Sequence, residues 1–136
     1  MSAPAHLVVA PLLAALVTAV LTTLTRRWSR LQRTISLLGG LAYLLAVALL
    51  ARDVLAGGPA TYQVSAWRPP FGIVLVADAL AVFMLAIAAI VGVATLVYAA
   101  VGLDEFAQRV SYHPLFHFML LGATGAFLTG DIFNLF

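Results

Sequence analysis

The sequence contains no cysteine, no lysine and a single glutamate. Without cysteine there is no disulfide framework, no thiolate metal site and no cysteine nucleophile. Charged residues make up only 9% of the 136 residues, whereas soluble domains carry about 25%, and hydrophobic residues make up 64%. A domain of this size has too much surface for so few polar residues to cover. The composition therefore excludes a water-soluble globule and predicts a surface that faces lipid or partner subunits.

Signatures of several other protein classes are absent as well. The net charge is only +2, carried by arginines scattered between apolar segments, so we expect no nucleic-acid partner. The sequence has no glycine-rich phosphate loop, no nucleophile elbow and no closely spaced pair of carboxylates. It therefore does not resemble a soluble enzyme, and we expect no cofactor.

Uncharged segments of membrane-spanning length alternate with short loops that contain arginine. A helix rises about 1.5 Å per residue, so about 20 residues cross a hydrocarbon core of roughly 30 Å. The sequence predicts four transmembrane helices and the first turn of a fifth, at about 6–25, 34–51, 73–101, 114–129 and 131–136. We therefore expect an all-α polytopic membrane protein, with residues 1–136 in a single membrane domain.

The loops predict an orientation. Five of the seven arginines fall in the loops at 26–33 and 102–113. Because arginine is enriched in cytoplasmic loops, these two loops are predicted to be cytoplasmic and both termini to lie outside. The longest loop, at 52–70, has glycines and prolines on both sides of Thr61–Trp67, which predicts an extended stretch between two turns.

Asp78 is the one charged residue between Phe71 and Leu103. A carboxylate at the bilayer centre costs roughly 2.5 to 3.5 kcal/mol and usually marks an ion or proton pathway. However, the helix that follows Asp78 is long enough to span the membrane alone, which would leave Asp78 in a structural role at the outer interface. Asp78 is therefore a candidate pathway residue with a structural alternative.

His113 and His117 are four residues apart, so a helix places them on one face. Imidazole changes charge near neutral pH, which suits a proton relay at a cytoplasmic entrance. The alternative is a pair of interfacial histidines bonded to backbone or lipid. No metal site is expected, because Pro114 stands where the zinc-protease motif has glutamate and there is no third ligand.

Two polar residues accompany the start of the predicted fifth helix. Asp131 follows Gly130 and is a typical helix N-cap, and Asn134 lies about one turn further on. We count both as candidate pathway residues, with capping as the alternative for Asp131.

Two sequence blocks indicate a protein family more specifically than the overall composition does. The first is WRPPFGIVLVAD at 67–78, and the second runs from HPLFHFMLLG at 113–122 to GAFLTGDIFNLF at 125–136. Both resemble the D-type member of Mrp-type multisubunit cation/proton antiporters, a family similar to the antiporter-like membrane subunits of respiratory complex I. The resemblance covers nearly the whole chain but only the amino-terminal third or so of a typical member.

This resemblance implies a secondary transporter component and not an enzyme. It would exchange cytoplasmic Na⁺ or another monovalent cation for external protons, driven by the proton-motive force, in a bacterial-type plasma membrane beside A- to G-type partner subunits. Asp78, His117, Asp131 and Asn134 match polar positions of the family. The glutamate and lysines that members use for transport lie further along their chains, so we expect the amino-terminal piece of a longer subunit or one half of a split subunit completed by a second chain.

The sequence leaves two alternatives open. One is a small structural membrane subunit that packs beside a complete antiporter, a complex I-like assembly or a hydrogenase and translocates no ions. The absence of lysine favours this alternative. The other is a subunit of a quinone-linked translocase of the complex I type.

Overall fold

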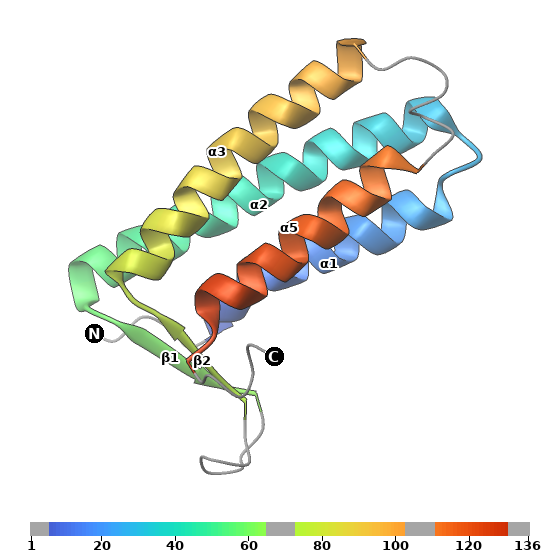
Figure 1. Cartoon of the computed structure of the whole chain (residues 1–136). Helices are drawn as coiled ribbons and strands as arrows, with labels where there is room; N and C mark the ends of the chain where they lie inside the picture. Colours follow the sequence, from blue (N-terminus) through green and yellow to red (C-terminus); the bar gives the residue numbers. More distant parts are fainter. Residues whose placement is uncertain (1–5, 65–72, 103–110, 131–136) are drawn as a thin grey trace.

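Four long helices account for most of the computed structural model, which describes residues 6–64, 73–102 and 111–130 (Figure 1). The helices are α1 (His6–Leu24), α2 (Ser29–Gly57), α3 (Ala79–Gly102) and α5 (Tyr112–Leu128). Two short strands, β1 (Ala60–Gln63) and β2 (Val74–Ala77), follow α2 and precede α3.

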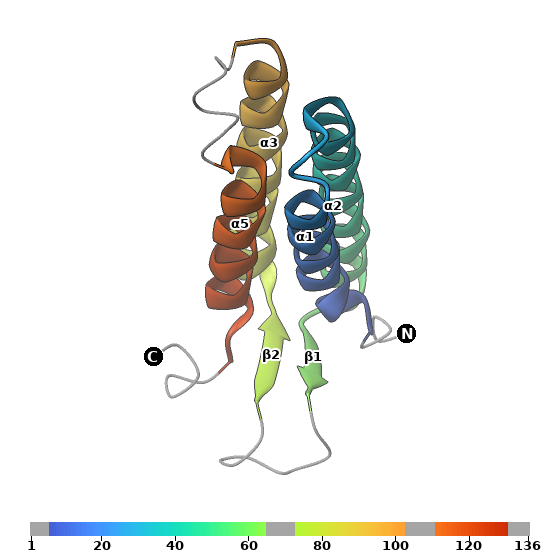
Figure 2. The same cartoon turned by 90° about the vertical axis from the view of Figure 1, so that its right-hand side faces the viewer.

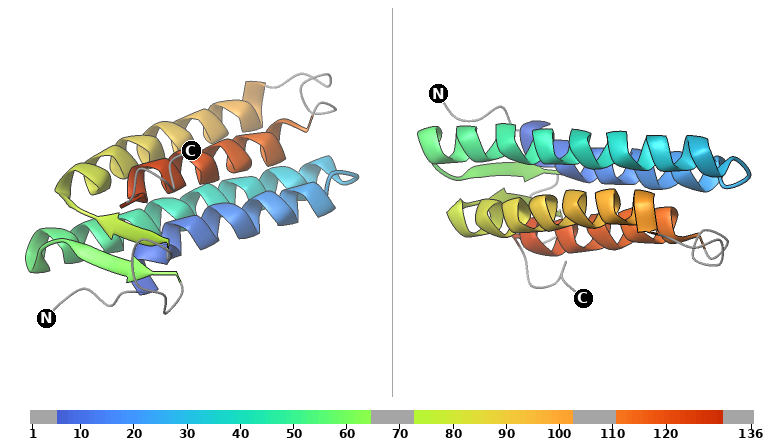
Figure 3. Two further views of the ribbon diagram at one scale, coloured as in Figure 1. Left: turned by 60° about the horizontal axis from the view of Figure 1, so that its bottom comes forward. Right: turned by 90° about the horizontal axis from the view of Figure 1, so that it is seen from above.

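The four helices lie side by side as a bundle (Figure 2). In the view from above in Figure 3 (right), α1 and α2 form one layer, and α3 and α5 form the other. α2 packs closely against both α1 and α3, and α5 packs closely against α1. α3 and α5 meet much more sparsely.

The two ends of the bundle differ. At one end, which we call the arginine end, α1 passes into α2 through a tight turn at Thr25–Trp28 that contains Arg26 and Arg27. α3 ends and α5 begins at this same end (Figure 1). At the opposite end, the ribbon end, β1 and β2 pair antiparallel with Ala60 opposite Ala77.

The chain after α5 also joins the ribbon. Leu75 of β2 forms an isolated antiparallel bridge with Thr129, and the Gly130 N–H donates to the Val74 carbonyl at 2.9 Å. A Cβ at Gly130 would lie only 2.5 Å from Cγ2 of Val76, so glycine allows the chain to pass this close. Three segments distant in sequence are thereby held together at the ribbon end.

The helix predicted to start near residue 73 begins at Ala79 instead. Residues Val74–Ala77 form β2, because their backbone groups pair with β1. The helix predicted at 34–51 is longer in the structure, at 29–57, and the one predicted from 114 begins at Tyr112. The predicted start of a fifth helix, 131–136, lies outside the described residues.

The outer surface of the bundle is apolar. Large hydrophobic side chains on all four helices are exposed, including Leu13, Leu45, Phe83 and Met119. Among the described residues, α1, α2 and α3 are long and apolar enough to cross a membrane, and α5 has 17 residues. Such a surface suits lipid or neighbouring membrane helices and does not suit water.

A pair of glycines lets α2 pack closely on both sides. A Cβ at Gly39 would overlap the side chain of Thr18 on α1. A Cβ at Gly40 would lie 2.6 Å from Cδ1 of Leu96 on α3. Small residues allow this backbone approach in membranes, where helices associate without a hydrophobic driving force between them.

Candidate functional site

Buried polar side chains are concentrated on three of the four helices. α1, α2 and α5 contribute Thr18, Thr22, Gln32, Ser36, His113, His117 and Thr124, whereas the buried residues of α3 are all apolar or glycine. A buried polar group is costly in an apolar environment unless it is hydrogen-bonded. The candidate site is therefore expected where α1, α2 and α5 meet.

The central feature is a hydroxyl held between two imidazoles. Ser36 Oγ on α2 lies 2.9 Å from Nε2 of His117 and 3.0 Å from Nδ1 of His113, both on α5. Ser36 and His117 are fully buried and His113 is 1% exposed. We call these three side chains the Ser–His–His cluster.

Local sequence explains how α5 presents both histidines. Their four-residue spacing places them on one face of the helix, which turns toward α2. Pro114 lies in the first turn, where the missing N–H breaks no helical bond. Ser111 precedes the helix with a φ of 61°, and its carbonyl accepts the Leu115 N–H at 3.2 Å.

Aromatic rings hold the two imidazoles from the side. Tyr112 contacts His113 and Phe116 contacts His117, each edge to face with ring centroids 5.5 Å apart. Two ring nitrogens remain without a partner among the described residues, Nε2 of His113 and Nδ1 of His117. Each histidine is thus hydrogen-bonded to Ser36 through one ring nitrogen. Its other ring nitrogen is buried and has no hydrogen-bond partner among the described residues.

Arg33 lies about one turn before Ser36 on α2. Its Nη1 lies 3.5 Å from the Ala100 carbonyl oxygen of α3, and its Nε is buried with no partner in the described part of the chain. Its positive charge acts on His113. The arginine end thus brings one cation close to the Ser–His–His cluster.

A second polar pair lies about two turns deeper between the same helices. The Tyr43 hydroxyl lies 2.7 Å from Oγ1 of Thr124. The Thr124 hydroxyl donates its proton to the Leu120 carbonyl at 2.7 Å, so Tyr43 is the donor in the Tyr43–Thr124 bond. Ser36 and Tyr43 are seven residues apart, as are His117 and Thr124, so α2 and α5 run in parallel with a constant register.

A third polar contact joins α1 to α2. The Gln32 side-chain amide donates to the Thr22 carbonyl at 2.8 Å. The Thr22 hydroxyl bonds within its own helix, to the carbonyls of Thr18 and Ala19. This hydrogen bond connects the start of α2 to the end of α1. Gln32 lies about one helical turn before Ser36 of the Ser–His–His cluster.

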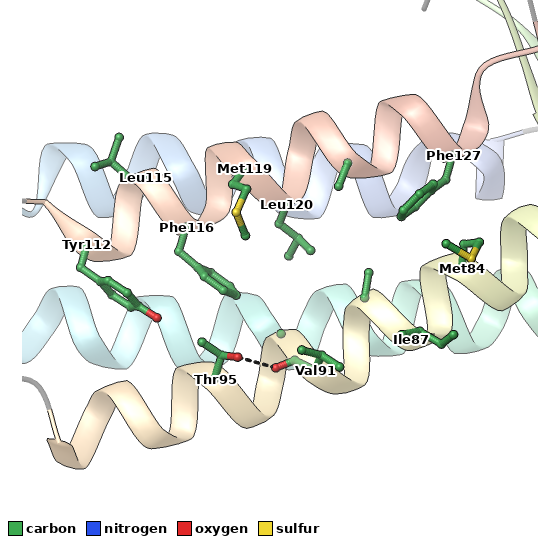
Figure 4. Close-up of a pocket in the computed structure, with 13 residues that line it drawn as sticks. Met84, Ile87, Val91, Thr95, Tyr112, Leu115, Phe116, Met119, Leu120 and Phe127 are labelled. Atoms are coloured by element: carbon green, nitrogen blue, oxygen red, sulfur yellow. Dashed lines mark hydrogen bonds between the residues drawn. The ribbon is translucent and has the colours of Figure 1, made fainter.

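An adjacent face of α5 borders an apolar groove of about 990 Å³ between α3 and α5. Figure 4 shows side chains of both helices along it, among them Met84, Ile87, Phe116, Met119 and Phe127. Thr95, which also lines the groove, donates its hydroxyl to the Val91 carbonyl of its own helix at 2.8 Å. The groove has no charged side chain among its lining residues.

Asp78 is placed far from the histidines. It is exposed at the ribbon end, directly before α3, and its Oδ1 accepts the Ala81 N–H at 2.7 Å. Asp78 is therefore the N-cap of α3. His113 lies in the first turn of α5, at the arginine end, so the two candidates are at opposite ends of the bundle. Asp131 and Asn134 lie outside the described residues.

Sequence reasoning did not identify Ser36, Tyr43 or Thr124. A signal was present in the matched seven-residue spacings of Ser36 with Tyr43 and of His117 with Thr124. Seven residues make about two helical turns, so each pair shares one helix face. Recognising the signal required knowing that α2 and α5 are neighbours.

Comparison with known proteins gives homologues along nearly the whole chain. It is 39% identical over 131 residues to the D-type Na⁺/H⁺ antiporter subunit of Alkalihalophilus pseudofirmus, a match that covers 96% of this chain and 27% of the relative. It is 37% identical over 136 residues to the N-type NADH-quinone oxidoreductase subunit of Desulforudis audaxviator, covering 98% of this chain and 26% of the relative. The chain thus spans about a quarter of the length of these relatives. No family model matches the chain.

A solved structure shares the fold. The membrane-bound sulfane sulfur reductase, an archaeal respiratory membrane complex, contains a chain that superposes with a TM-score of 0.74 at 30% sequence identity. The match covers 95% of this chain and 26% of that one.

Proposed function

This chain is homologous to the D-type subunits of Na⁺/H⁺ antiporters and to the N-type subunits of NADH-quinone oxidoreductases, and on that basis we propose that it is the amino-terminal portion of an antiporter subunit. In our proposal the complete subunit works in a multisubunit complex of the plasma membrane. The complex exchanges cytoplasmic Na⁺, or another monovalent cation, for external protons and uses the proton-motive force. A- to G-type subunits are its proposed partners.

The structural observation that supports this proposal beside the homology is the buried Ser–His–His cluster. Ionisable groups inside membrane bundles are costly and usually belong to ion or proton pathways. Imidazole both accepts and donates protons near neutral pH. Two buried histidines, each with a free nitrogen among the described residues, supply a way to move protons in a subunit of this ancestry.

We propose an orientation with the arginine end in the cytoplasm and the amino terminus outside, and α5 as a fourth membrane-spanning helix. Arg26 and Arg27 at the turn between α1 and α2 support this choice. His113 and His117 then belong to the cytoplasmic half of the pathway.

The other candidates are not part of the Ser–His–His cluster. Asp131 and Asn134 lie outside the described residues, and we retain them as proposed pathway residues. Asp78 lies at the ribbon end, where its carboxylate caps α3. Its capping bond accounts for its position without a pathway role.

The test is cation-dependent proton movement in everted membrane vesicles that contain the complete subunit and its complex. We expect added Na⁺ to dissipate a preformed pH gradient, and parallel additions of K⁺ and Li⁺ to identify the preferred cation. Vesicles without the subunit are the control. A gradient that none of the three cations dissipates would refute the antiporter proposal.

A respiratory complex is the second candidate. The similarity to an N-type oxidoreductase subunit and to a chain of the sulfane sulfur reductase complex favours it. In this case proton movement would require an electron donor, and Na⁺ alone would have no effect. A structural subunit without ion movement, the remaining alternative, predicts that transport persists when the two histidines are replaced.

A further inference from the structure

We propose that Ser36 is a proton relay residue that joins His113 and His117 into one proton-conducting unit. This inference rests on the proposed antiporter function and adds to it a residue on a different helix. It is drawn from the positions of three buried side chains and from the hydrogen-bonding capacity of a hydroxyl group.

A serine hydroxyl has one proton to donate and two lone pairs that accept. Ser36 Oγ lies within hydrogen-bond distance of one nitrogen from each histidine, at 2.9 and 3.0 Å. It can therefore donate to one imidazole while it accepts from the other. The three side chains form a continuous hydrogen-bonded chain, and this chain has two possible directions.

In the first direction, the His113 Nδ1–H donates to Ser36, and the Ser36 hydroxyl donates to His117 Nε2. His113 Nε2 then has a free lone pair, and His117 carries its proton on Nδ1. In the second direction every bond is reversed. The two free nitrogens, His113 Nε2 and His117 Nδ1, are the ones that are buried without a partner among the described residues.

Moving one proton converts the first direction into the second. A proton binds to His113 Nε2, the proton on His113 Nδ1 passes to Ser36 Oγ, and the Ser36 proton passes to His117 Nε2. His117 then releases its Nδ1 proton. One proton enters and one leaves, and the unit must return to its first direction before another can pass the same way.

The Tyr43–Thr124 pair shows why a buried hydroxyl is not always a relay. There the Thr124 hydroxyl donates to a backbone carbonyl, which can only accept. The direction of the Tyr43–Thr124 bond is therefore fixed. Ser36 has imidazole nitrogens on both sides, and these can exchange roles.

The charged and titratable groups around the unit are few. Arg33 on α2 acts electrostatically on His113, and Tyr112 on α5 contacts its ring edge to face. Among the described residues, the only such group on α1 is His6, at the ribbon end, and the only one on α3 is Tyr98, which is 75% exposed. Proton movement through the unit should therefore depend mainly on the two histidines, modulated by Arg33.

The test uses the complete subunit in its assembled complex and measures Na⁺-dependent proton exchange from pH 6 to 9. We expect Ser36→Ala to lower the exchange rate at least about tenfold, since positioned proton-transfer groups contribute large factors. Ser36→Thr and Ser36→Val form a matched pair, because their side chains have the same shape and differ in the hydroxyl. We expect Ser36→Thr to retain exchange and Ser36→Val to lose it.

Tyr43→Phe is the control, since it removes a buried hydrogen bond between the same two helices without changing the cluster. We expect it to keep the wild-type rate and pH profile. If Ser36→Ala and Ser36→Val also keep the wild-type exchange rate and pH profile, the relay proposal is wrong, whereas the antiporter function stands. Equal losses in Ser36→Thr and Ser36→Val would show a packing role and also overturn the relay. A wild-type complex without cation-dependent exchange would instead refute the proposed function itself.

Discussion

The two faces of α5 differ in chemistry and in packing. One face meets α1 and α2 and holds the Ser–His–His cluster and the Tyr43–Thr124 bond. The other borders the apolar groove toward α3, where Phe116, Met119 and Phe127 line the wall (Figure 4). One helix therefore separates a polar interface from an apolar one.

The difference follows from the cost of polar groups in a membrane. A buried hydroxyl or imidazole requires a partner at hydrogen-bond distance, and side chains of α2 and α5 supply such partners to each other. Gly39 holds α2 close to α1 on the same side of the bundle. The groove requires no fixed distances, because its contacts are dispersive. We expect changes on the polar face to affect proton movement and changes in the groove to have little effect on it.

The largest effect is expected at His117. Glutamine is similar in size and polar but does not titrate, so His117→Gln should lower cation-dependent proton exchange about a hundredfold and alter its pH dependence. The control, Met119→Ala, changes the groove face of the same helix and should leave the rate and profile unchanged. The measurement is exchange rate against pH in vesicles. An unaltered pH profile for His117→Gln would exclude His117 from the pathway.

The next effect concerns packing. Gly39→Ala places a methyl group on the Thr18 side chain, which should lower the free energy of unfolding by about 1 to 3 kcal/mol. Gly92→Ala is the matched change beside the groove, where the nearest atom, Cζ of Phe116, lies at an ordinary 3.6 Å. Gly92→Ala should not lower the free energy of unfolding, and the helix propensity of alanine should raise it by up to about 1 kcal/mol. Denaturant unfolding of the purified complex measures both.

A rescue makes the packing prediction specific. Thr18→Ala removes the two atoms nearest to the new methyl group, Cγ2 and Oγ1, and leaves Cβ at 2.7 Å, so the double variant Thr18→Ala with Gly39→Ala should regain part of the lost stability. Equal stability of Gly39→Ala and wild type would show that α1 and α2 are not held as closely as the structure describes.

Asp78 tests whether a carboxylate at the ribbon end is structural. Asp78→Ala removes the acceptor for the Ala81 N–H and should lower stability by about 1 kcal/mol, whereas Asp78→Asn should preserve it, because asparagine caps helices as well as aspartate does. We expect Asp78→Asn to retain the wild-type exchange rate as well. A stable Asp78→Asn variant with slow exchange would assign Asp78 to the ion pathway.

Sequence alone predicted the helical bundle and the shared helix face of His113 and His117, because both depend on periodicity within one segment. The strand at Val74–Ala77 was missed, since a short apolar run before a long apolar helix has no distinguishing period. Arg30 and Arg33 were assigned to a loop, yet both lie in the first turns of α2. Long arginine side chains can extend from a helix end to a polar environment, so charge does not fix the helix boundary.

Ser36 was missed for a different reason. Nothing in its local sequence distinguishes it from other helical serines, and its role depends on a neighbour 81 positions away in the chain. The identical offset of 81 for Tyr43 and Thr124 shows the same tertiary register. Only the pairing of α2 with α5 reveals either contact.

The smallest effect is expected at the Tyr43–Thr124 bond. Hydrogen bonds between membrane helices contribute about 0.6 kcal/mol on average, because the unfolded segments also find partners within the membrane. A double-mutant cycle of Tyr43→Phe and Thr124→Val should give a coupling energy of this size, measured by denaturant unfolding, with no change in the pH profile of exchange. A change in that profile would mean that this pair also takes part in proton movement, and the fixed direction of its hydrogen bond argues against this, since Thr124 already donates to Leu120.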